Sequence, residues 1–286
     1  MSTVHASCLC GAVAWEADGP LEFMSHCHCG RCRKAHGAAF ATYVMCPPEA
    51  FRLVRGADAI GRVEAASGLT RAFCTRCGSV VTDGRPWQGL VGFPAGPLDD
   101  DPGVRPLAHI FVASKAPWDT IADDLPRFVA FPGSVGVAPL ADLAPRDPDT
   151  GRPRGSCLCG DVAYVVEGLP LRVYNCHCGR CRKARGAAFA TNLFTSADGV
   201  RFTRGEDRIA LFRLPGAQFF AQAFCRGCGS PMPRIEPARG LAIVPMGGLD
   251  DDPGARPDRH IFTASKAPWY EIADDLPQYA ERAPTL

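Results

Sequence analysis

The hydrophobic positions of this chain fall into short runs that are separated by glycine and proline. Residues 12–19 (AVAWEADG) and 161–168 (DVAYVVEG) combine β-branched, aromatic and small residues next to glycine. The same character is found in four further runs, at residues 41–46, 51–56, 208–214 and 241–248. Short runs of this composition, bounded by glycine or proline, are typical of β-strands. We therefore predict a mainly β fold with little helix.

One basic segment that occurs twice could begin a short helical turn. It stands at residues 30–40 (GRCRKAHGAAF) and again at residues 179–189 (GRCRKARGAAF). Gly37 and Gly186 limit its length, because glycine in a helix interior costs about 1 kcal/mol relative to alanine. Helix content is therefore expected to be low.

A long internal repeat organises the chain. Residues 27–42 match residues 176–191 at 15 of 16 positions. Two further pairs of segments recur in the same order, 72–79 with 223–230 and 109–118 with 260–269. The repeated units are far longer than the roughly 20–50 residues of solenoid repeats. We interpret them as two whole domains that arose by duplication.

The composition places the boundary between these domains. Residues 132–154 are rich in proline, glycine and aspartate and show little apolar periodicity, as is typical of linkers. We predict a first domain at residues 1–133, a linker at 134–151 and a second domain at 152–286.

The overall composition excludes several classes of protein. With 47% hydrophobic and 21% charged residues, a net charge of +1 and a pI of about 7.5, the chain has no global field that would attract nucleic acid or an anionic membrane. No apolar run approaches the roughly 18 residues that span a bilayer. The N-terminus shows neither a basic nor an apolar signal region. We expect a cytoplasmic protein with no nucleic-acid or membrane partner.

Fifteen cysteines are the most informative residues of the chain. They cluster as CxC, CxCxxC and CxxC motifs, in a chain without a visible secretory signal. Disulfide scaffolds instead spread their cysteines through short secreted chains. Clustered thiols in a reducing compartment more often hold a metal, so zinc is predicted in preference to disulfides.

One set of cysteines in each domain forms a complete four-thiolate site. A CxC motif near the domain start and a CxxC motif followed by glycine together supply four ligands, and zinc prefers such tetrahedral thiolate sets. The glycine after the CxxC permits the positive φ of a zinc knuckle. The residues are Cys8, Cys10, Cys74 and Cys77, and in the second domain Cys157, Cys159, Cys225 and Cys228. We predict a structural role for both sites.

The remaining CxCxxC motif supplies only three thiolates. Its residues are Cys27, Cys29 and Cys32, and in the second domain Cys176, Cys178 and Cys181. Catalytic zinc sites generally keep three protein ligands and one exchangeable position, so we predict these six cysteines to be catalytic. The alternative is a hidden fourth ligand. His28, or the equivalent pair His109 and His260, could serve, whereas His26 is Asn175 in the second domain.

A thiolate-rich zinc with an open position favours the binding of a thiol, because a coordinating thiol is held as the thiolate. Basic residues surround each cluster in the sequence: Arg31, Arg33, Lys34, Arg180, Arg182 and Lys183. We predict that these cations offset the negative charge of the cluster and pair with the carboxylates of an acidic thiol. The alternative is solvated surface charge.

The motifs together resemble the glutathione-dependent formaldehyde-activating enzyme family, whose zinc domain is shared with centromere protein V. The resemblance rests on SCLCG, CHCxxCRKxxGAAF, FCxxCGS, DDDPG, HIFxASKAPW and DDLP, which occur in both halves. It implies Mss4-like β-rich domains with two zincs each, the four-cysteine site structural and the three-cysteine site catalytic. The implied reaction adds the thiol of glutathione to formaldehyde and gives S-hydroxymethylglutathione, a carbon–sulfur lyase reaction in reverse.

The chain departs from the family in ways that affect the substrate. The family commonly has one domain per chain, whereas this chain has two. The halves also diverge after the last knuckle, where residues 80–83 (VVTD) face residues 231–234 (PMPR). The two pockets are therefore expected to share their chemistry but not necessarily their substrate. A non-catalytic thiol-binding module and a redox switch are the alternative functions.

Overall fold

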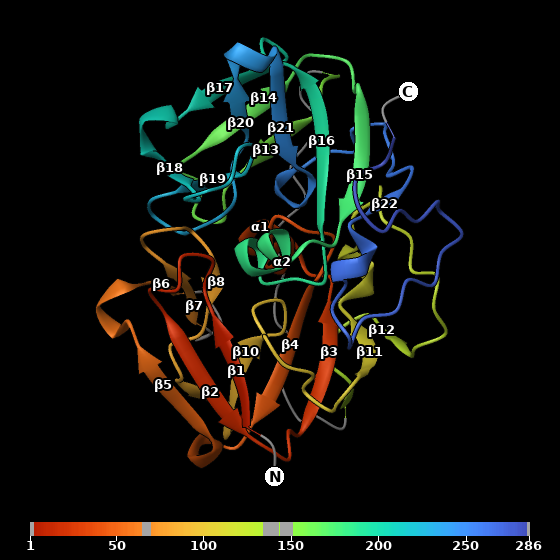
Figure 1. Cartoon of the computed structure of the whole chain (residues 1–286). Helices are drawn as coiled ribbons and strands as arrows, with labels where there is room; N and C mark the ends of the chain where they lie inside the picture. Colours follow the sequence, from red (N-terminus) through yellow and green to blue (C-terminus); the bar gives the residue numbers. More distant parts are fainter. Residues whose placement is uncertain (1–2, 65–69, 134–142, 144–150, 285–286) are drawn as a thin grey trace.

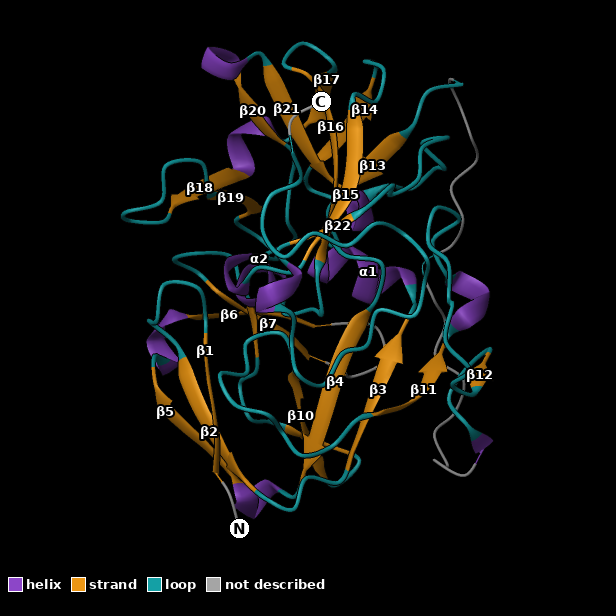
Figure 2. Ribbon diagram, turned by 45° about the vertical axis from the view of Figure 1, so that its right-hand side comes forward, coloured by secondary structure: helices purple, strands orange, loops and turns teal. Residues whose placement is uncertain are grey.

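The computed structural model describes residues 3–64, 70–133, 143 and 151–284. We call residues 3–133 the first repeat and residues 151–284 the second repeat. The predicted linker at 134–151 lies outside the described residues, apart from 143 and 151. Each repeat is built mainly of strands, and a short helix from each repeat lies where the two meet (Figures 1 and 2). The prediction of a mainly β chain with little helix is confirmed.

The first repeat forms three sheets. Their orders are β1-β2-β5, β12-β11-β3-β4-β10-β9 and β6-β7-β8. The pairing is antiparallel except where β11 lies parallel to β3 and β12. The strands are β1 (Thr3–Ser7), β2 (Ala14–Asp18), β3 (Phe23–Cys27), β4 (Ala41–Cys46), β5 (Phe51–Arg55), β6 (Ile60–Glu64), β7 (Thr70–Cys74), β8 (Val80–Val81), β9 (Pro86–Trp87), β10 (Leu90–Pro94), β11 (Pro106–Ile110) and β12 (Arg127–Phe128).

The second repeat forms three corresponding sheets. Their orders are β13-β14-β17, β20-β21-β16-β15-β22 and β18-β19, and β22 lies parallel to β15. The strands are β13 (Arg154–Ser156), β14 (Ala163–Val166), β15 (Arg172–Cys176), β16 (Ala190–Ser196), β17 (Val200–Arg204), β18 (Ile209–Arg213), β19 (Ala221–Cys225), β20 (Arg234–Glu236), β21 (Leu241–Pro245) and β22 (His260–Ile261).

The six apolar runs recognised in the sequence all contain strands. They hold β2, β14, β4, β5, β18 and β21. Trp15 on β2 and Val44 on β4 are buried in the core. Along most of both strands, buried positions alternate with less buried ones, as half-buried strands require. β-branched and aromatic side chains therefore set the strand positions, as predicted.

Two α-helices occur in the described part of the chain, α1 (Gly30–His36) and α2 (Gly179–Arg185). Gly37 and Gly186 follow them with φ of 58° and 63°, the left-handed conformation that glycine adopts without steric cost. The predicted short helical turns are confirmed. The 3-10 helices of the described residues are η1 (Pro48–Ala50), η2 (Ala57–Ala59), η3 (Val112–Ser114), η5 (Glu206–Arg208), η6 (Pro237–Arg239), η7 (Met246–Gly248) and η8 (Thr263–Ser265). No helix of the described residues is long and apolar enough to cross a membrane.

The hydrophobic core is continuous across the two repeats. One cluster of buried residues includes Trp15 and Phe40 of the first repeat and Phe189 and Trp269 of the second. The Phe40 and Phe189 rings meet edge to face, with centroids 5.5 Å apart. Such pairs add to the free energy gained by burying the rings. The repeats therefore stabilise each other through a shared core.

Polar contacts between the repeats come in equivalent pairs. Lys34 Nζ donates to the Ser156 carbonyl (2.9 Å) and lies 2.6 Å from Asp250. Lys183 Nζ makes the counterpart contacts, to Ser7 Oγ (2.7 Å) and to Asp99 (2.7 Å). Because each lysine reaches the equivalent residues of the other repeat, the two repeats are related by an approximate two-fold axis.

Candidate metal centres and the second-repeat pocket

The four cysteines predicted for the first structural site lie together. Cys8 and Cys10 follow β1, Cys74 ends β7 and Cys77 lies in the turn before β8, and their four sulfurs are all within 4.8 Å of one another. The Cys8–Cys10 and Cys10–Cys74 sulfur separations are 3.5 and 3.8 Å. Tetrahedral zinc with bonds near 2.3 Å requires sulfurs about 3.8 Å apart. The donor set therefore fits zinc.

The second repeat carries the equivalent cluster. The sulfurs of Cys157, Cys159, Cys225 and Cys228 also lie within 4.8 Å of one another. The Cys157–Cys159 and Cys159–Cys225 sulfur separations are 3.4 and 3.8 Å. These contacts join the start of the repeat to β19, which is far away in the sequence.

Backbone and hydroxyl groups support the sulfurs of both clusters. The Val13 amide donates to Cys8 Sγ and the Val162 amide to Cys157 Sγ, each at 3.3 Å. Ser79 Oγ accepts from the Leu9 amide at 3.0 Å and lies 3.2 Å from Cys77 Sγ. Amide donors stabilise the thiolate form that a metal requires.

The CxCxxC cysteines form separate three-sulfur clusters at the start of each helix. Cys27 ends β3, Cys29 caps the N-terminus of α1 and Cys32 lies in its first turn, with all three sulfurs within 4.8 Å. The Cys32 amide donates to Cys29 Sγ at 3.4 Å, and a hydrogen bond from Cys27 holds the pKa of Cys29 well below its usual range. A strand end and a helix N-cap therefore bring the three thiols together.

The second three-sulfur cluster repeats this geometry. Cys176 ends β15, Cys178 caps α2 and Cys181 lies in its first turn. The Cys181 amide donates to Cys178 Sγ at 3.4 Å. A hydrogen bond from Cys176 and another from Cys181 lower the pKa of Cys178 to about 3. Both clusters offer three sulfur donors to a soft metal such as zinc.

The histidines near the clusters are engaged elsewhere. His109 Nε2–H donates to Asp123 at 3.0 Å, which leaves its Nδ1 to accept from His28 Nε2–H at 2.8 Å. His177, His260 and Asp274 repeat this chain. Burial lowers the pKa of His28 to about 3, so the ring is neutral at pH 7. In the described part of the chain no histidine or carboxylate joins either three-sulfur cluster.

The basic residues predicted as thiol contacts of the two clusters have different partners in the structure. The Lys34 and Lys183 amines face the other repeat, as described above. Arg33 Nε and Arg182 Nε each donate at 3.2 Å to a backbone carbonyl, of Ser114 and Ser265 respectively.

The two remaining basic residues differ in exposure. Arg31 is half-buried on α1, whereas Arg180 is exposed on α2 and lines the pocket described below. Arg180 is thus one predicted contact that the structure places beside the second cluster.

Arg71 is the cation that contacts the first three-cysteine cluster. Its Nη2 donates to Cys32 Sγ and its Nη1 to Tyr43 Oη, both at 3.1 Å, and the guanidinium lies 5.4 Å from the centre of the Tyr43 ring. The motifs did not point to Arg71, which comes from β7, far along the chain. Its equivalent in the second repeat is Gln222, so a comparison of the halves could have found the position.

Aromatic side chains lie against the first cluster. Phe111 packs on the three cysteines, and Phe131 meets it edge to face with centroids 5.0 Å apart. Trp87 lies 5.6 Å from Phe131. Cys27, Cys29 and Cys32 are all buried. The first site is therefore closed.

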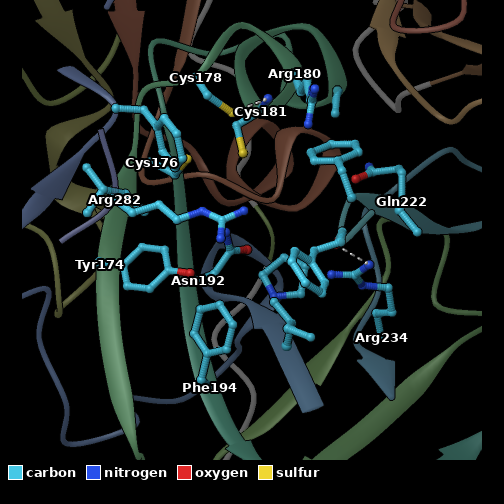
Figure 3. Close-up of a pocket in the computed structure, with 18 of the residues that line it drawn as sticks. Tyr174, Cys176, Cys178, Arg180, Cys181, Asn192, Phe194, Gln222, Arg234 and Arg282 are labelled. Atoms are coloured by element: carbon cyan, nitrogen blue, oxygen red, sulfur yellow. Dashed lines mark hydrogen bonds between the residues drawn. The ribbon is translucent and has the colours of Figure 1, made fainter. Parts of the chain in front are cut away.

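The second cluster opens instead into a pocket of about 1470 Å³. Cys176, Cys178 and Cys181 line it together with Tyr174 and Asn192, whose side chains share the pocket wall in Figure 3. Cys178 and Cys181 are only half-buried. A small molecule can reach these sulfurs.

Among the described residues, seven arginines and one carboxylate, Glu281, line the pocket. Arg234 lies 2.7 Å from Glu236, and Arg259 lies 2.7 Å from Asp258. The surface is nevertheless cationic, because Glu281, Glu236 and Asp258 together cannot offset seven guanidinium groups. An anion would be attracted to such a surface.

Comparison with known proteins identifies the family. The profile of the glutathione-dependent formaldehyde-activating enzyme family matches residues 3–114 and residues 152–265. The chain belongs to this family. Two matched segments confirm the predicted tandem duplication. No curated protein matches the chain. A crystal structure of a Rhodobacter sphaeroides protein is 25% identical over 36% of this chain and 97% of that chain, with a TM-score of 0.28.

The two segments that match the family profile contain all the clustered cysteines. Two residues that distinguish the sites lie outside these segments. Phe131 covers the first cluster, and its equivalent Arg282 lines the pocket at the second. The clustered cysteines are therefore common to both repeats, whereas access to the three-cysteine cluster differs between them.

Proposed function

We propose that the chain is a zinc-dependent enzyme of carbon–sulfur lyase type. It joins a glutathione-like thiol to formaldehyde or another small aldehyde. The observation that supports this function is a cluster of three thiols, without a fourth protein ligand among the described residues, beside an open pocket. Zinc bound there would take up an incoming thiol and hold it as the thiolate.

The protein side chains would position the two reactants. Addition forms a C–S bond, breaks the π bond of the aldehyde, and moves the thiol proton to the carbonyl oxygen. Burial raises the pKa of Tyr174 above its usual range, so its O–H stays protonated at pH 7 and can donate to that oxygen. Asn192 offers an amide donor next to it on β16. Positioning would supply most of the acceleration.

The rate of adduct formation tests this function. NMR exchange spectroscopy of glutathione and formaldehyde would give the rate with and without zinc-loaded protein. We expect an excess over the uncatalysed rate that the double variant Cys29→Ser, Cys178→Ser loses, because each cluster then lacks its N-cap thiol. A double variant as fast as the wild type would refute a catalytic role for the clusters. Cys46→Ser is the matched control, since Cys46 is a buried cysteine outside every cluster.

Zinc content tests the cofactor assignment separately. We propose two zincs per repeat, because each repeat holds one four-sulfur and one three-sulfur cluster. Elemental analysis of protein purified without chelator should then find about four zincs per chain. A value near two would leave only the four-cysteine sites filled.

The same clusters support two alternative functions. A non-catalytic thiol-binding module would bind glutathione saturably in calorimetry without accelerating any aldehyde reaction. A redox switch would release zinc and form a disulfide when oxidised, and the low pKa of Cys178 favours such reactivity. Mass spectrometry after mild peroxide treatment would then find a bridge within a three-cysteine cluster.

A further inference from the structure

Equivalent positions around the two three-cysteine clusters differ in charge. In the second repeat Arg185, Arg234 and Arg282 line the pocket. The corresponding residues of the first repeat are His36, Asp83 and Phe131. The cysteines themselves are unchanged, so the divergence concerns what surrounds the metal centre and not what binds the metal.

The first cluster already has its charge compensated and its access blocked. Arg71 donates to Cys32 Sγ at 3.1 Å, which places one guanidinium against the thiolates. Phe111 and Phe131 cover the buried sulfurs. The sulfurs of the first cluster are therefore less accessible to an anionic thiol than Cys178 and Cys181 of the second.

The second cluster has the opposite character. Arg172, Arg180, Arg185 and Arg282 line its pocket, and no carboxylate among the described residues forms an ion pair with them. Arg185 is only 7% exposed, and its Nη1 has no hydrogen-bond partner. That nitrogen is closed to solvent and would lie 2.9 Å from a Cβ atom on Gly37 of the first repeat, so Arg185 adds positive charge to the pocket wall, while the exposed Arg172, Arg180 and Arg282 are the groups that a ligand can contact.

Aromatic rings hold two of these guanidinium groups in place. Arg172 lies 4.5 Å from the centre of the Phe194 ring, and Arg282 lies 5.4 Å from that of Phe219. Stacking fixes the plane of a guanidinium and leaves its N–H edge available for bidentate binding of a carboxylate or phosphate. In Figure 3 the guanidinium of Arg282 extends over the centre of the pocket.

We propose that only the second three-cysteine site admits a substrate, and that this substrate is a polyanionic thiol. This inference takes the proposed function as its basis. The pocket has four arginines without carboxylate partners, which is more positive charge than one ligand carboxylate could neutralise. Its volume of about 1470 Å³ is also larger than the roughly 300–1,000 Å³ of common ligand sites. The negative charge can come from carboxylates or from phosphates, since both bind guanidinium groups in the same way.

Calorimetry on the zinc-loaded chain tests the ligand class. The probes are glutathione with two carboxylates, coenzyme A with phosphates, and cysteamine with no acidic group. We expect one binding event per chain for the anionic thiols and much weaker binding of cysteamine. The tighter of the two anionic probes identifies carboxylate or phosphate as the preferred charge. Two equal events per chain, or equal affinity for all three probes, would overturn the proposal.

Arginine variants assign the binding to this pocket. Arg180→Ala and Arg282→Ala should each weaken binding of the anionic probes on the order of tenfold, because each removes a charge-assisted hydrogen bond. Binding of cysteamine should not change. Arg256→Ala is the matched control, since Arg256 lies in the same repeat and pairs with Asp252 away from the pocket. Unchanged affinity in both pocket variants would overturn the proposal.

Alkylation measures access to the sulfurs independently of turnover. Zinc-free protein is treated with anionic iodoacetate or neutral iodoacetamide, and the labelled cysteines are identified by mass spectrometry. Cys178 should react at least about tenfold faster than Cys29, with a preference for iodoacetate that Arg282→Ala reduces. Equal labelling of the two clusters would overturn the inference even if catalysis were found. The expected labelling and binding without excess catalysis would instead refute only the proposed function.

Discussion

Arg71 on β7 and Gln222 on β19 occupy equivalent positions in the two repeats, but only Arg71 is charged. The three-cysteine clusters of the two repeats have the same cysteines. Arg71 donates to both Cys32 Sγ and Tyr43 Oη at 3.1 Å. A buried guanidinium next to a thiolate stabilises the negative form of the sulfur. One residue therefore changes the electrostatics of the first three-cysteine site, although the three cysteines are the same in both repeats.

Replacing Arg71 by glutamine should weaken zinc binding at the first three-cysteine site. The charge-assisted hydrogen bond to Cys32 is worth roughly 1.5–3 kcal/mol, which corresponds to at least about tenfold in affinity. Competition with a coloured chelator would measure the loss. Arg62→Gln is the control, because Arg62 is an exposed arginine of the same repeat that pairs with Asp83. Equal zinc retention in wild type and Arg71→Gln would contradict the prediction.

His36 makes folding stability depend on pH. Its Nδ1–H donates to the Arg185 carbonyl at 2.7 Å and its Nε2 accepts from Tyr43 at 3.0 Å. Burial lowers its pKa from 6.5 to about 3. Between these values the unfolded chain binds a proton that the folded chain does not, so stability falls as pH drops below about 6.5.

As the pH is lowered, we expect the free energy of unfolding to decrease less in His36→Gln than in the wild type. Between pH 7 and pH 5 the wild type should lose about 2 kcal/mol more of its free energy of unfolding than the variant, since one pKa unit corresponds to about 1.4 kcal/mol. Urea denaturation of both proteins at the two pH values measures it. Comparing the variant with the wild type cancels the pH dependence of the thiolates. Parallel pH profiles for the two proteins would show that His36 titrates normally.

The grouping of the cysteines into four clusters could be predicted from the sequence, whereas the surroundings of these clusters could not. Cysteine spacing reports coordination directly, because a CxCxxC or a CxxC turn brings thiols together locally. Arg71 and Phe131 reach the first cluster only through the pairing of distant strands and the path of the chain after β12. Such contacts have no local signal, although the differences between the halves mark the positions.

At the scale of elements, α1 and α2 explain why the predicted basic cluster is divided. Successive residues of a helix point about 100° apart, so Arg33 and Lys34 are neighbours in sequence but face different partners. Arg33 donates to the Ser114 carbonyl in its own repeat, and Lys34 reaches Asp250 in the other. A linear sequence does not show this separation until the helix phase is known. The short helices thus serve as both metal-site caps and interface elements.

Lys34→Ala should destabilise the protein strongly. Lys34 and Asp250 are both buried, and removing one partner of a buried ion pair costs about 3–5 kcal/mol because the other charge is left uncompensated. Lys183→Ala is the matched variant. Its partner Asp99 is half exposed, so the expected cost is only about 1 kcal/mol or less. Chemical denaturation would give both values, and equal costs would contradict the assignment of a buried pair.

At the scale of the whole molecule, the two repeats form a pseudo-dimer within one chain. The approximate two-fold relation extends from the lysine contacts to the backbone. A Cβ atom on Gly96 would lie 2.3 Å from the Ala187 amide nitrogen, and one on Gly247 would lie 2.3 Å from that of Ala38. Equivalent glycines therefore allow the repeats to approach closely on both sides of the axis. An isologous interface of this kind can also form between two copies of one unit.

The first repeat expressed alone, as residues 1–133, should therefore form a homodimer. Separated from the second repeat, it would expose Phe40 and leave the Lys34 amine without Asp250. In a homodimer, Phe40 of a second copy would take the place of Phe189, and Asp99 of that copy would take the place of Asp250. Light scattering combined with size-exclusion chromatography would measure the mass. Lys34→Ala in the isolated repeat should weaken the dimer, whereas the exposed substitution Arg105→Ala, whose side chain pairs with Asp101, should not. A folded monomer would mean that each repeat has a core sufficient for its own stability, and that the shared core is not required for folding.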